Sequence, residues 1–260
     1  MLKIQSLASG SRGNSTYICS EKSAVLVDVG IGLRTMLQRM KDANIEPLSV
    51  KAIVITHEHS DHIKGVAQFA GKFRCPVFIH KAAVKCFQHV GQIPMQLIQT
   101  FDDSFDVDDI RISFFPLPHD SEFCFGYSFQ NAGAKISVAT DLGSLPADAM
   151  NHMRGSQIVM IESNYDPIRL RASVKYPAWL KRRVRDTHLS NNACCECVEE
   201  LSKDGLQQVI LAHTSQENNS PTLAYSCMCE FLQKRGIIEG EDIFVDVAEQ
   251  DKVSIMFQVD

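Results

Sequence analysis

Three histidines and an aspartate stand close together in this chain, in the segment His57-Glu58-His59-Ser60-Asp61-His62. For a chain of this composition, a His-x-His-x-Asp-His match is expected less than about once in a thousand sequences. In an extended backbone His57 and His59 point to the same side, and one further turn can bring Asp61 and His62 beside them. Imidazole together with carboxylate suits zinc, iron or manganese rather than calcium. The segment therefore predicts a metal site and argues against a solvated loop that is merely rich in histidine.

Further metal ligands are expected at the ends of other predicted strands, because four residues on one loop cannot fill two metal shells. Asp141 follows the apolar run Ile136–Thr140, and His119 and His213 each follow an apolar run in the same way. Polar residues at strand ends are where the sites of layered α/β folds collect. With the first segment they give five histidines and two aspartates, which suits two divalent metal ions and an open position for solvent.

Short apolar runs typical of strands alternate along the chain with patterns of helical spacing. The predicted strands are Lys3–Ser9, Ser15–Cys19, Ala24–Val29, Val50–Thr56, Cys75–His80, Ile136–Thr140, Ile158–Glu162 and Gln208–Ala212. The predicted helices are Ile63–Phe73, Asn191–Lys203 and Pro221–Arg235, and a meander of short strands is expected over Thr100–Phe115. This order predicts an α/β fold in which two sheets pack face to face with helices outside. Residues 1–260 are expected to form a single domain.

The overall composition is that of a globular protein with a mildly acidic balance. The 260 residues carry a formal net charge of −5, and 45% of them are apolar. No apolar run approaches the roughly 18–20 residues that cross a bilayer, and the first 15 residues do not resemble a signal peptide. The nine cysteines follow no framework of spacings. We therefore expect reduced thiols, a cytoplasmic location and no membrane partner.

One segment departs from the acidic balance. Residues 167–185 include seven basic residues and no acidic one. Such a stretch beside a metal site indicates recognition of phosphate, whereas the alternative is a solvated helix face. Lys181, Arg182 and Arg183 are the candidates to hold backbone phosphates, together with Asn191.

A second, structural metal site could be formed by the cysteines. Cys194, Cys195 and Cys197, with Cys227 and Cys229, would supply enough thiolates for a zinc ion. Both groups lie on predicted helices, where cysteine more often packs as a small apolar side chain. The spacing is not that of a zinc knuckle, so this alternative is not favoured.

The order of the histidine and aspartate motifs resembles the metallo-β-lactamase superfamily over essentially the whole chain. The resemblance implies a four-layer αβ/βα sandwich with two mixed sheets. It also implies two divalent metal ions (zinc, manganese or iron). The implied ligands are His57, His59 and His119 for one metal, Asp61, His62 and His213 for the second, and Asp141 as a bridge between them.

Three other segments narrow the resemblance to the bacterial YycJ/WalJ-type subgroup. They are residues 9–15, 162–166 and 188–191. Two positions depart from the subgroup's pattern, since Tyr165 stands where histidine is usual and Thr187 where glycine is usual. Neither is expected to contact a metal ligand, but both are expected near the substrate face.

The resemblance implies a metal-dependent phosphodiesterase, specifically a DNA exonuclease in which a hydroxide between two metal ions attacks phosphorus. DNA is favoured over RNA as the nucleic acid partner. Asp61 would orient the hydroxide as well as bind metal. His188 is similar to an extra histidine of the transfer-RNA 3′-processing nucleases and would stabilise or protonate the leaving oxygen. The alternative interpretation of His188 is an exposed loop histidine before a helix.

Two other classes of function have to be separated from the nuclease. A small-molecule ester, thioester or lactone hydrolase of the same fold would need neither the basic segment nor His188. A non-enzymatic metal or nucleic-acid binder would have no use for an open site with two metal ions. The fold alone does not choose between these classes.

Overall fold

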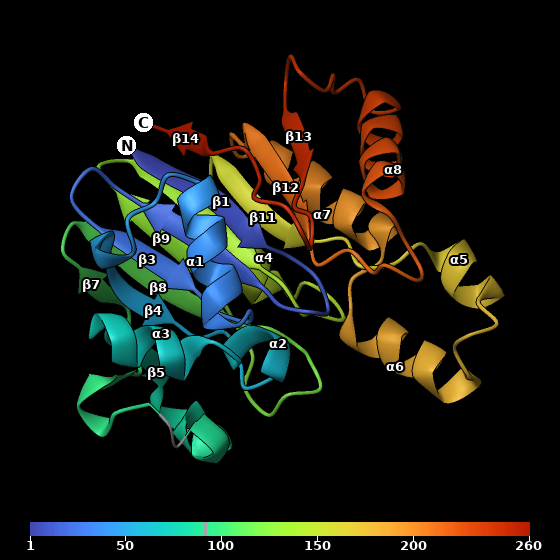
Figure 1. Ribbon diagram of the computed structural model, residues 1–260. Coiled ribbons are helices and arrows are strands. Elements are labelled where there is room, and N and C mark those ends of the chain that lie inside the picture. The colour runs from blue at the N-terminus through green and yellow to red at the C-terminus, as the bar shows by residue number, and fades with distance from the viewer. Residues whose placement is uncertain (91–92) are drawn as a thin grey trace.

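The computed structural model describes residues 1–90 and 93–260, and in this part of the chain two seven-stranded sheets pack face to face (Figure 1). The first sheet has the order β14-β1-β2-β3-β4-β5-β6. Its strands are, in that order, Phe257–Val259, Leu2–Ala8, Ser15–Cys19, Ala24–Val27, Val50–Val54, Val77–His80 and Ile98–Phe101. The second sheet has the order β13-β12-β11-β10-β9-β8-β7. Its strands are Phe244–Val247, Gln208–Ala212, Ile158–Glu162, Ala134–Ala139, Phe125–Asn131, Ile110–Pro116 and Phe105–Val107.

Each sheet is mixed, with one antiparallel and one parallel half. Strands β3 to β6 are parallel in the first sheet, and β10 to β13 are parallel in the second. The most apolar runs form the central strands: every residue of β3 and β11 is buried. Strands covered on both faces are expected to be continuously apolar in this way. The carboxyl ends of these parallel strands are the usual place for a site in such sheets.

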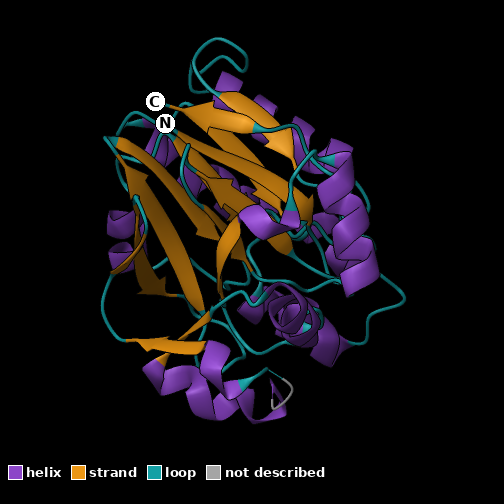
Figure 2. Ribbon diagram, turned by 60° about the vertical axis from the view of Figure 1, so that its left-hand side comes forward, coloured by secondary structure: helices purple, strands orange, loops and turns teal. Residues whose placement is uncertain are grey.

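Helices cover the outer faces of both sheets, which gives the predicted four-layer sandwich (Figure 2). The helices are α1 Leu33–Asp42, α2 Ser60–Ile63, α3 Val66–Phe73, α4 Ala147–Met153, α5 Pro167–Ala172, α6 Ala178–Thr187, α7 Asn191–Ser202 and α8 Pro221–Gln233, with short 3₁₀ helices at Pro47–Ser49, Lys81–Val90 and Met95–Leu97. Met36 of α1 and Phe69 of α3 pack in the cluster that joins the two sheets. Met153, Leu201 and Met228 bring α4, α7 and α8 onto the second sheet.

Two predicted elements differ from the structure. The single helix predicted over Ile63–Phe73 is broken into α2 and α3, because Gly65 lies against the backbone of another segment. A Cβ at Gly65 would lie 2.1 Å from the carbonyl oxygen of Ile31, and the Gly65 amide donates to Val29. The short strands predicted over Thr100–Phe115 are present, and β7 and β8 pair antiparallel as a meander requires, but β6 belongs to the first sheet and not to that meander. The chain crosses between the sheets within that segment.

Helices α5 and α6 form an arm that lies apart from both sheets (Figure 1). We call residues 166–187 the α5–α6 arm. It has its own small apolar cluster, in which Leu170 and Val184 pack with Tyr165. No helix in the described residues is both long and apolar enough to cross a bilayer.

Candidate metal centre

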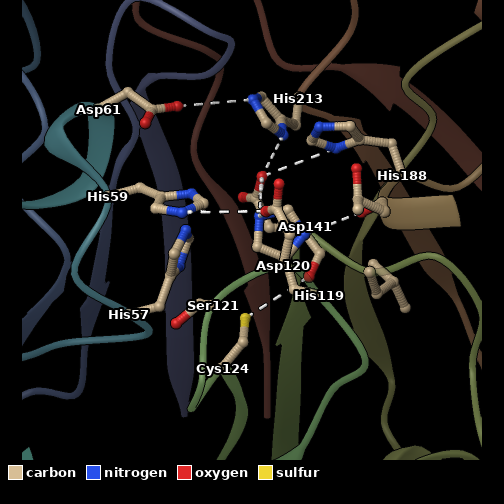
Figure 3. A network of polar contacts seen from close by, with 12 residues as sticks. His57, His59, Asp61, His119, Asp120, Ser121, Cys124, Asp141, His188 and His213 are labelled. Carbon is tan, nitrogen blue, oxygen red and sulfur yellow. Dashed lines mark hydrogen bonds and ion pairs between the residues drawn. The ribbon is translucent and has the colours of Figure 1, made fainter. Parts of the chain in front are cut away.

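The seven predicted metal ligands lie together where strands of both sheets end. Figure 3 labels all of them except His62. His57 follows β4, Asp141 follows β10 and His213 follows β12. A cavity of about 270 Å³ opens over them and is lined by His59, Asp61, His119, Asp141 and His213, among others. His57 and His62 lie beneath it, fully buried. The tertiary structure thus brings together residues that are up to 156 positions apart in the sequence.

One group of possible ligands consists of His57, His59 and His119, whose ligand atoms lie within 4.8 Å of one another. The ring of His57 is 4.6 Å from that of His59 and 5.1 Å from that of His119. Thr56 Oγ1 lies 3.0 Å from Nδ1 of His57, which leaves Nε2 as the nitrogen that faces the group. These three imidazoles are the set expected around one metal ion.

The second expected set, Asp61, His62 and His213, also converges. Oδ2 of Asp61 lies 3.8 Å from Nε2 of His62 and 3.8 Å from Nε2 of His213. Asp141 lies between the two sets. Its Oδ2 is 3.0 Å from Nε2 of His62, and its Oδ1 is 3.0 Å from Nδ1 of His213 and 3.8 Å from Nε2 of His119. This is the position that a bridging carboxylate would need.

Two buried nitrogen atoms show that a cation fits this cluster. Nε2 of His57 and Nε2 of His213 have no hydrogen-bond partner among residues 1–90 and 93–260. Buried polar atoms are almost always paired, because an unpaired one loses its bonds to water without replacement. Imidazole nitrogens that face carboxylates in a buried cluster are suitable ligands for a divalent metal ion. The site can therefore bind divalent metal.

Three residues at the strand ends adopt a backbone conformation that non-glycine residues rarely take. Asp28, Asp141 and His213 have φ values of 60°, 62° and 50°. Such a left-handed residue costs of the order of 1–3 kcal/mol and persists where the surroundings hold it in place. At the end of β10 and of β12, this sharp turn leaves the side chain facing the cavity.

Two buried carboxylates accept hydrogen bonds from Nδ1 atoms of histidines at the site. Glu162 Oε1 accepts hydrogen bonds from Nδ1 of His188 at 2.8 Å and from Nδ1 of His213 at 3.0 Å. Asp28 Oδ2 accepts from Nδ1 of His62 at 2.7 Å. Carboxylates in this position fix the orientation of metal-binding imidazoles. Sequence reasoning did not assign these roles to Asp28 and Glu162, although both stand at the end of an apolar strand, as Asp141 does.

The turn at residues 10–14, which contains Gly10 and Gly13, supports the loop that carries Asp61. The backbone amide of Asn14 donates to the carbonyl oxygen of Asp61 at 2.7 Å, and Nδ2 of Asn14 lies 3.0 Å from Nε2 of His62. Gly30 permits this contact, because a Cβ there would lie 1.7 Å from the Asp61 carbonyl oxygen. The turn, Gly30 and the loop of residues 57–62 therefore pack as one unit.

The residues predicted to act on or bind the substrate lie in three different places. His188 and Arg183 line the same cavity as five of the predicted metal ligands, and Arg183 Nε donates to Asp120 Oδ2 at 2.6 Å. Lys181 and Arg182 instead line a second cavity, of about 460 Å³, in the α5–α6 arm. Asn191 is 1% exposed, and its side chain bonds to Ser163 and Asn219. Asn191 therefore supports buried loops and does not face a substrate, contrary to the prediction.

The two positions that depart from the subgroup pattern have different surroundings. Tyr165 is buried in the apolar cluster of the α5–α6 arm. The carbonyl oxygen of Thr187 accepts from Nδ1 of His119 at 2.9 Å. The prediction that Thr187 contacts no expected ligand is therefore wrong. The contact is made by the backbone, so it does not depend on the side chain at this position.

The cysteines form no metal-binding group in the described part of the chain. The three groups found there consist of histidine and carboxylate alone. Cys194 and Cys195 are buried in the apolar cluster between the second sheet and its helices. The alternative of a structural zinc site on α7 and α8 therefore has no support there.

We expect the metal-free protein to lose stability as the pH rises from about 6.5 to 9. Burial alone would lower the pKa of His62, but the carboxylates of Asp141 and Asp28 outweigh it and raise the pKa to about 10. A raised pKa gives stability that is complete below the unfolded value of about 6.5 and is lost as the pH approaches 10. Thermal unfolding of metal-free protein across this range tests the expectation.

A matched control is Asp28→Asn, which removes one of the two carboxylates and should flatten the dependence on pH. Saturating zinc should also flatten it, because a metal ion takes the place of the proton. A melting temperature of the metal-free protein that stays constant or rises over this range would contradict the expectation.

Comparison with known proteins agrees with this geometry. The family model described as "Beta-lactamase superfamily domain" matches residues 23–214, which is more than half of the chain. Exodeoxyribonuclease YycJ of Bacillus anthracis is 31% identical over 240 residues, which are 90% of each chain. Exodeoxyribonuclease WalJ of Streptococcus pneumoniae serotype 2 is 28% identical over 264 residues, covering 99% of this chain and 98% of that protein.

Among solved structures, the metallo-beta-lactamase fold protein YhfI of Bacillus subtilis has the same fold. Its TM-score is 0.72 at 14% identity, over 97% of this chain and 98% of that chain. From the matched family model and the near full-length relative, the chain belongs to the β-lactamase superfamily and, within it, to the family of the YycJ exodeoxyribonuclease.

Proposed function

We propose that this protein is a metal-dependent phosphodiesterase that acts as an exonuclease on DNA. The observation that carries the proposal is that His188 and Arg183 line the same cavity as the metal-binding residues. A phosphodiester needs a cation for its charge and an acid for its leaving oxygen, and these two side chains can supply them. The names of the relatives YycJ and WalJ support DNA as the substrate.

The metal-binding residues divide into two sets in this proposal. His57, His59 and His119 would hold one divalent ion, and Asp61, His62 and His213 the other, with Asp141 in contact with both. Zinc, manganese and iron all suit these ligands. When bound, such ions stabilise charge on the phosphoryl group and lower the pKa of a water molecule so that it can act as a nucleophile.

The remaining roles belong to side chains of the chain itself. Asp61, at the edge of the cavity, would accept a hydrogen bond from the attacking water and orient it. His188 donates Nδ1–H to the buried carboxylate of Glu162, so its Nε2 is the nitrogen left to act in the cavity. As the water oxygen bonds to phosphorus, its proton is released to solvent by way of the Asp61 carboxylate; as the bond to the leaving oxygen breaks, the proton on Nε2 of His188 passes to that oxygen.

We also propose that the protein acts in the cytoplasm. All nine cysteines are free in the structure, including Cys195 on α7 and Cys227 on α8, which lie within hydrogen-bond contact of each other. Free thiols in such number are typical of a reducing compartment. They take no part in the chemistry proposed above.

The test is incubation of the purified protein with end-labelled single- and double-stranded DNA and RNA, with zinc, manganese or iron supplied in turn. We expect DNA to be shortened from its ends, and the His59→Ala variant to be inactive while it keeps the circular dichroism spectrum of the wild type. A panel of thioesters and lactones tests the alternative function. Hydrolysis of a thioester or lactone without hydrolysis of nucleic acid would replace the proposal with a small-molecule hydrolase.

A further inference from the structure

The α5–α6 arm carries an exposed aromatic side chain among basic residues. Trp179 is the single tryptophan of the chain, and it is 67% exposed on α6. The arm also holds all seven basic residues of the segment 167–185, and it lies apart from the sheets (Figure 1). The flat ring of Trp179 can stack on a planar group, and aromatic side chains with one face in solvent are enriched at binding surfaces.

Helix α6 separates two cavities. Leu180, Arg183 and Val184 line the cavity over the metal-binding residues. Lys181 and Arg182 line the second cavity. Trp179 precedes Arg182 by three residues and Arg183 by four, and residues at these spacings are neighbours on a helix surface. Trp179 therefore lies on the exposed surface of α6 between a cation of one cavity and a cation of the other.

The second cavity is built for an anion with an apolar part. Four cations line it, namely Arg171, Lys181, Arg182 and Arg185, and none of the described residues that line it has a carboxylate. Its remaining lining is largely apolar and includes Tyr165 and Leu170. Lys181 Nζ donates to the carbonyl oxygen of Arg171 at 2.8 Å, which ties α6 to α5. A nucleotide, with a phosphate and a flat base, has this combination of properties.

We propose that Trp179 and the second cavity form a track for single-stranded nucleic acid that leads away from the metal centre. The indole ring stacks on a base, and the cations of the cavity hold the phosphate of a nucleotide beyond the bond to be cut. This proposal rests on the nuclease function proposed above. Stacking on aromatic rings tolerates every base, which suits an enzyme that digests a strand from its end without reading its sequence.

Because Trp179 is the single tryptophan, the intrinsic fluorescence of the protein reports on this position alone. The test is titration of metal-loaded protein with an oligothymidylate whose phosphorothioate linkages resist hydrolysis. We expect the fluorescence to be quenched on binding. With a labelled oligonucleotide, Trp179→Ala should weaken binding by about 5- to 150-fold and Trp179→Phe by much less, because phenylalanine can still stack. Arg182→Ala should weaken binding and reduce its dependence on salt.

Ile168→Ala is the matched control, since Ile168 is equally exposed on the same arm and lines neither cavity. It should bind the oligonucleotide as the wild type does. Oligonucleotide binding without change in tryptophan fluorescence would overturn the track. The track would also be overturned if phosphatidylserine vesicles, and not the oligonucleotide, quenched the fluorescence, or if the quenching followed self-association of the protein. If the protein hydrolyses ordinary DNA but Trp179→Ala leaves oligonucleotide binding unchanged, the track is overturned and the nuclease function stands. If the oligothymidylate quenches the fluorescence but ordinary DNA is not hydrolysed, the nuclease function is rejected.

Discussion

Replacement of Asp141 by asparagine should reduce hydrolysis by at least about 1000-fold in kcat/KM. Oδ1 of Asp141 lies 3.0 Å from His213, and Oδ2 lies 3.0 Å from His62. Burial alone would raise the pKa of Asp141, but His213 and His62 hold it well below its usual range, so the group is a carboxylate. Asparagine keeps the shape and removes the charge that two cations would share. Several kcal/mol of transition-state stabilisation would be lost, and about 1.4 kcal/mol corresponds to a factor of ten.

The metal content separates this effect from loss of the fold. Wild-type protein should bind about two equivalents of zinc by elemental analysis after dialysis, since two ligand sets are present, and Asp141→Asn should bind fewer. Asp148→Asn, a change of the same kind at an exposed position on α4, should behave as the wild type does. An Asp141→Asn protein that keeps both its metal and its activity would show that this carboxylate does not bridge the site.

Glu162→Gln should lower kcat by about 10- to 100-fold, the usual cost of losing a carboxylate behind an active imidazole. Glu162 is buried and orients His188 and His213 through the same oxygen atom. Its other oxygen accepts from the backbone amides of Leu142 and Leu189 at 3.0 and 3.2 Å. The amide nitrogen of glutamine cannot accept hydrogen bonds, so at least one buried donor would lose its partner, at about 1–3 kcal/mol of stability.

The choice of leaving group distinguishes a role in proton transfer from a purely structural one. A nucleoside leaving group needs the proton of His188, whereas p-nitrophenolate leaves without one. Glu162→Gln should therefore slow hydrolysis of a dinucleotide far more than hydrolysis of thymidine 5′-(p-nitrophenyl phosphate), and His188→Ala should show the same contrast. Equal losses of activity on both substrates, together with a lowered zinc content, would show that Glu162 only orients His213 and takes no part in proton transfer.

Local sequence was sufficient for the elements with the most continuous apolar runs. Strands β11 and β12 begin and end at the predicted residues, because each is a mostly buried run between polar segments. Sequence could not show the break at Gly65, since its cause is a backbone contact with Ile31, more than thirty positions away. The crossing between the sheets after β6 could not be predicted either, because the local sequence of a short strand does not specify which other strand it pairs with.

The amino-acid sequence by itself determined which groups can bind metal in this protein. The donor types and their spacing in residues 57–62 follow from local chemistry, as does the placing of Asp141 and His213 after apolar runs. The tertiary structure decided what each group has for neighbours. Glu162 accepts a hydrogen bond from His188, Arg183 lines the cavity over the predicted metal ligands, and Arg182 lines the second cavity. Ligand chemistry is a property of single residues, whereas orientation and access depend on segments that meet only when the two sheets pack together.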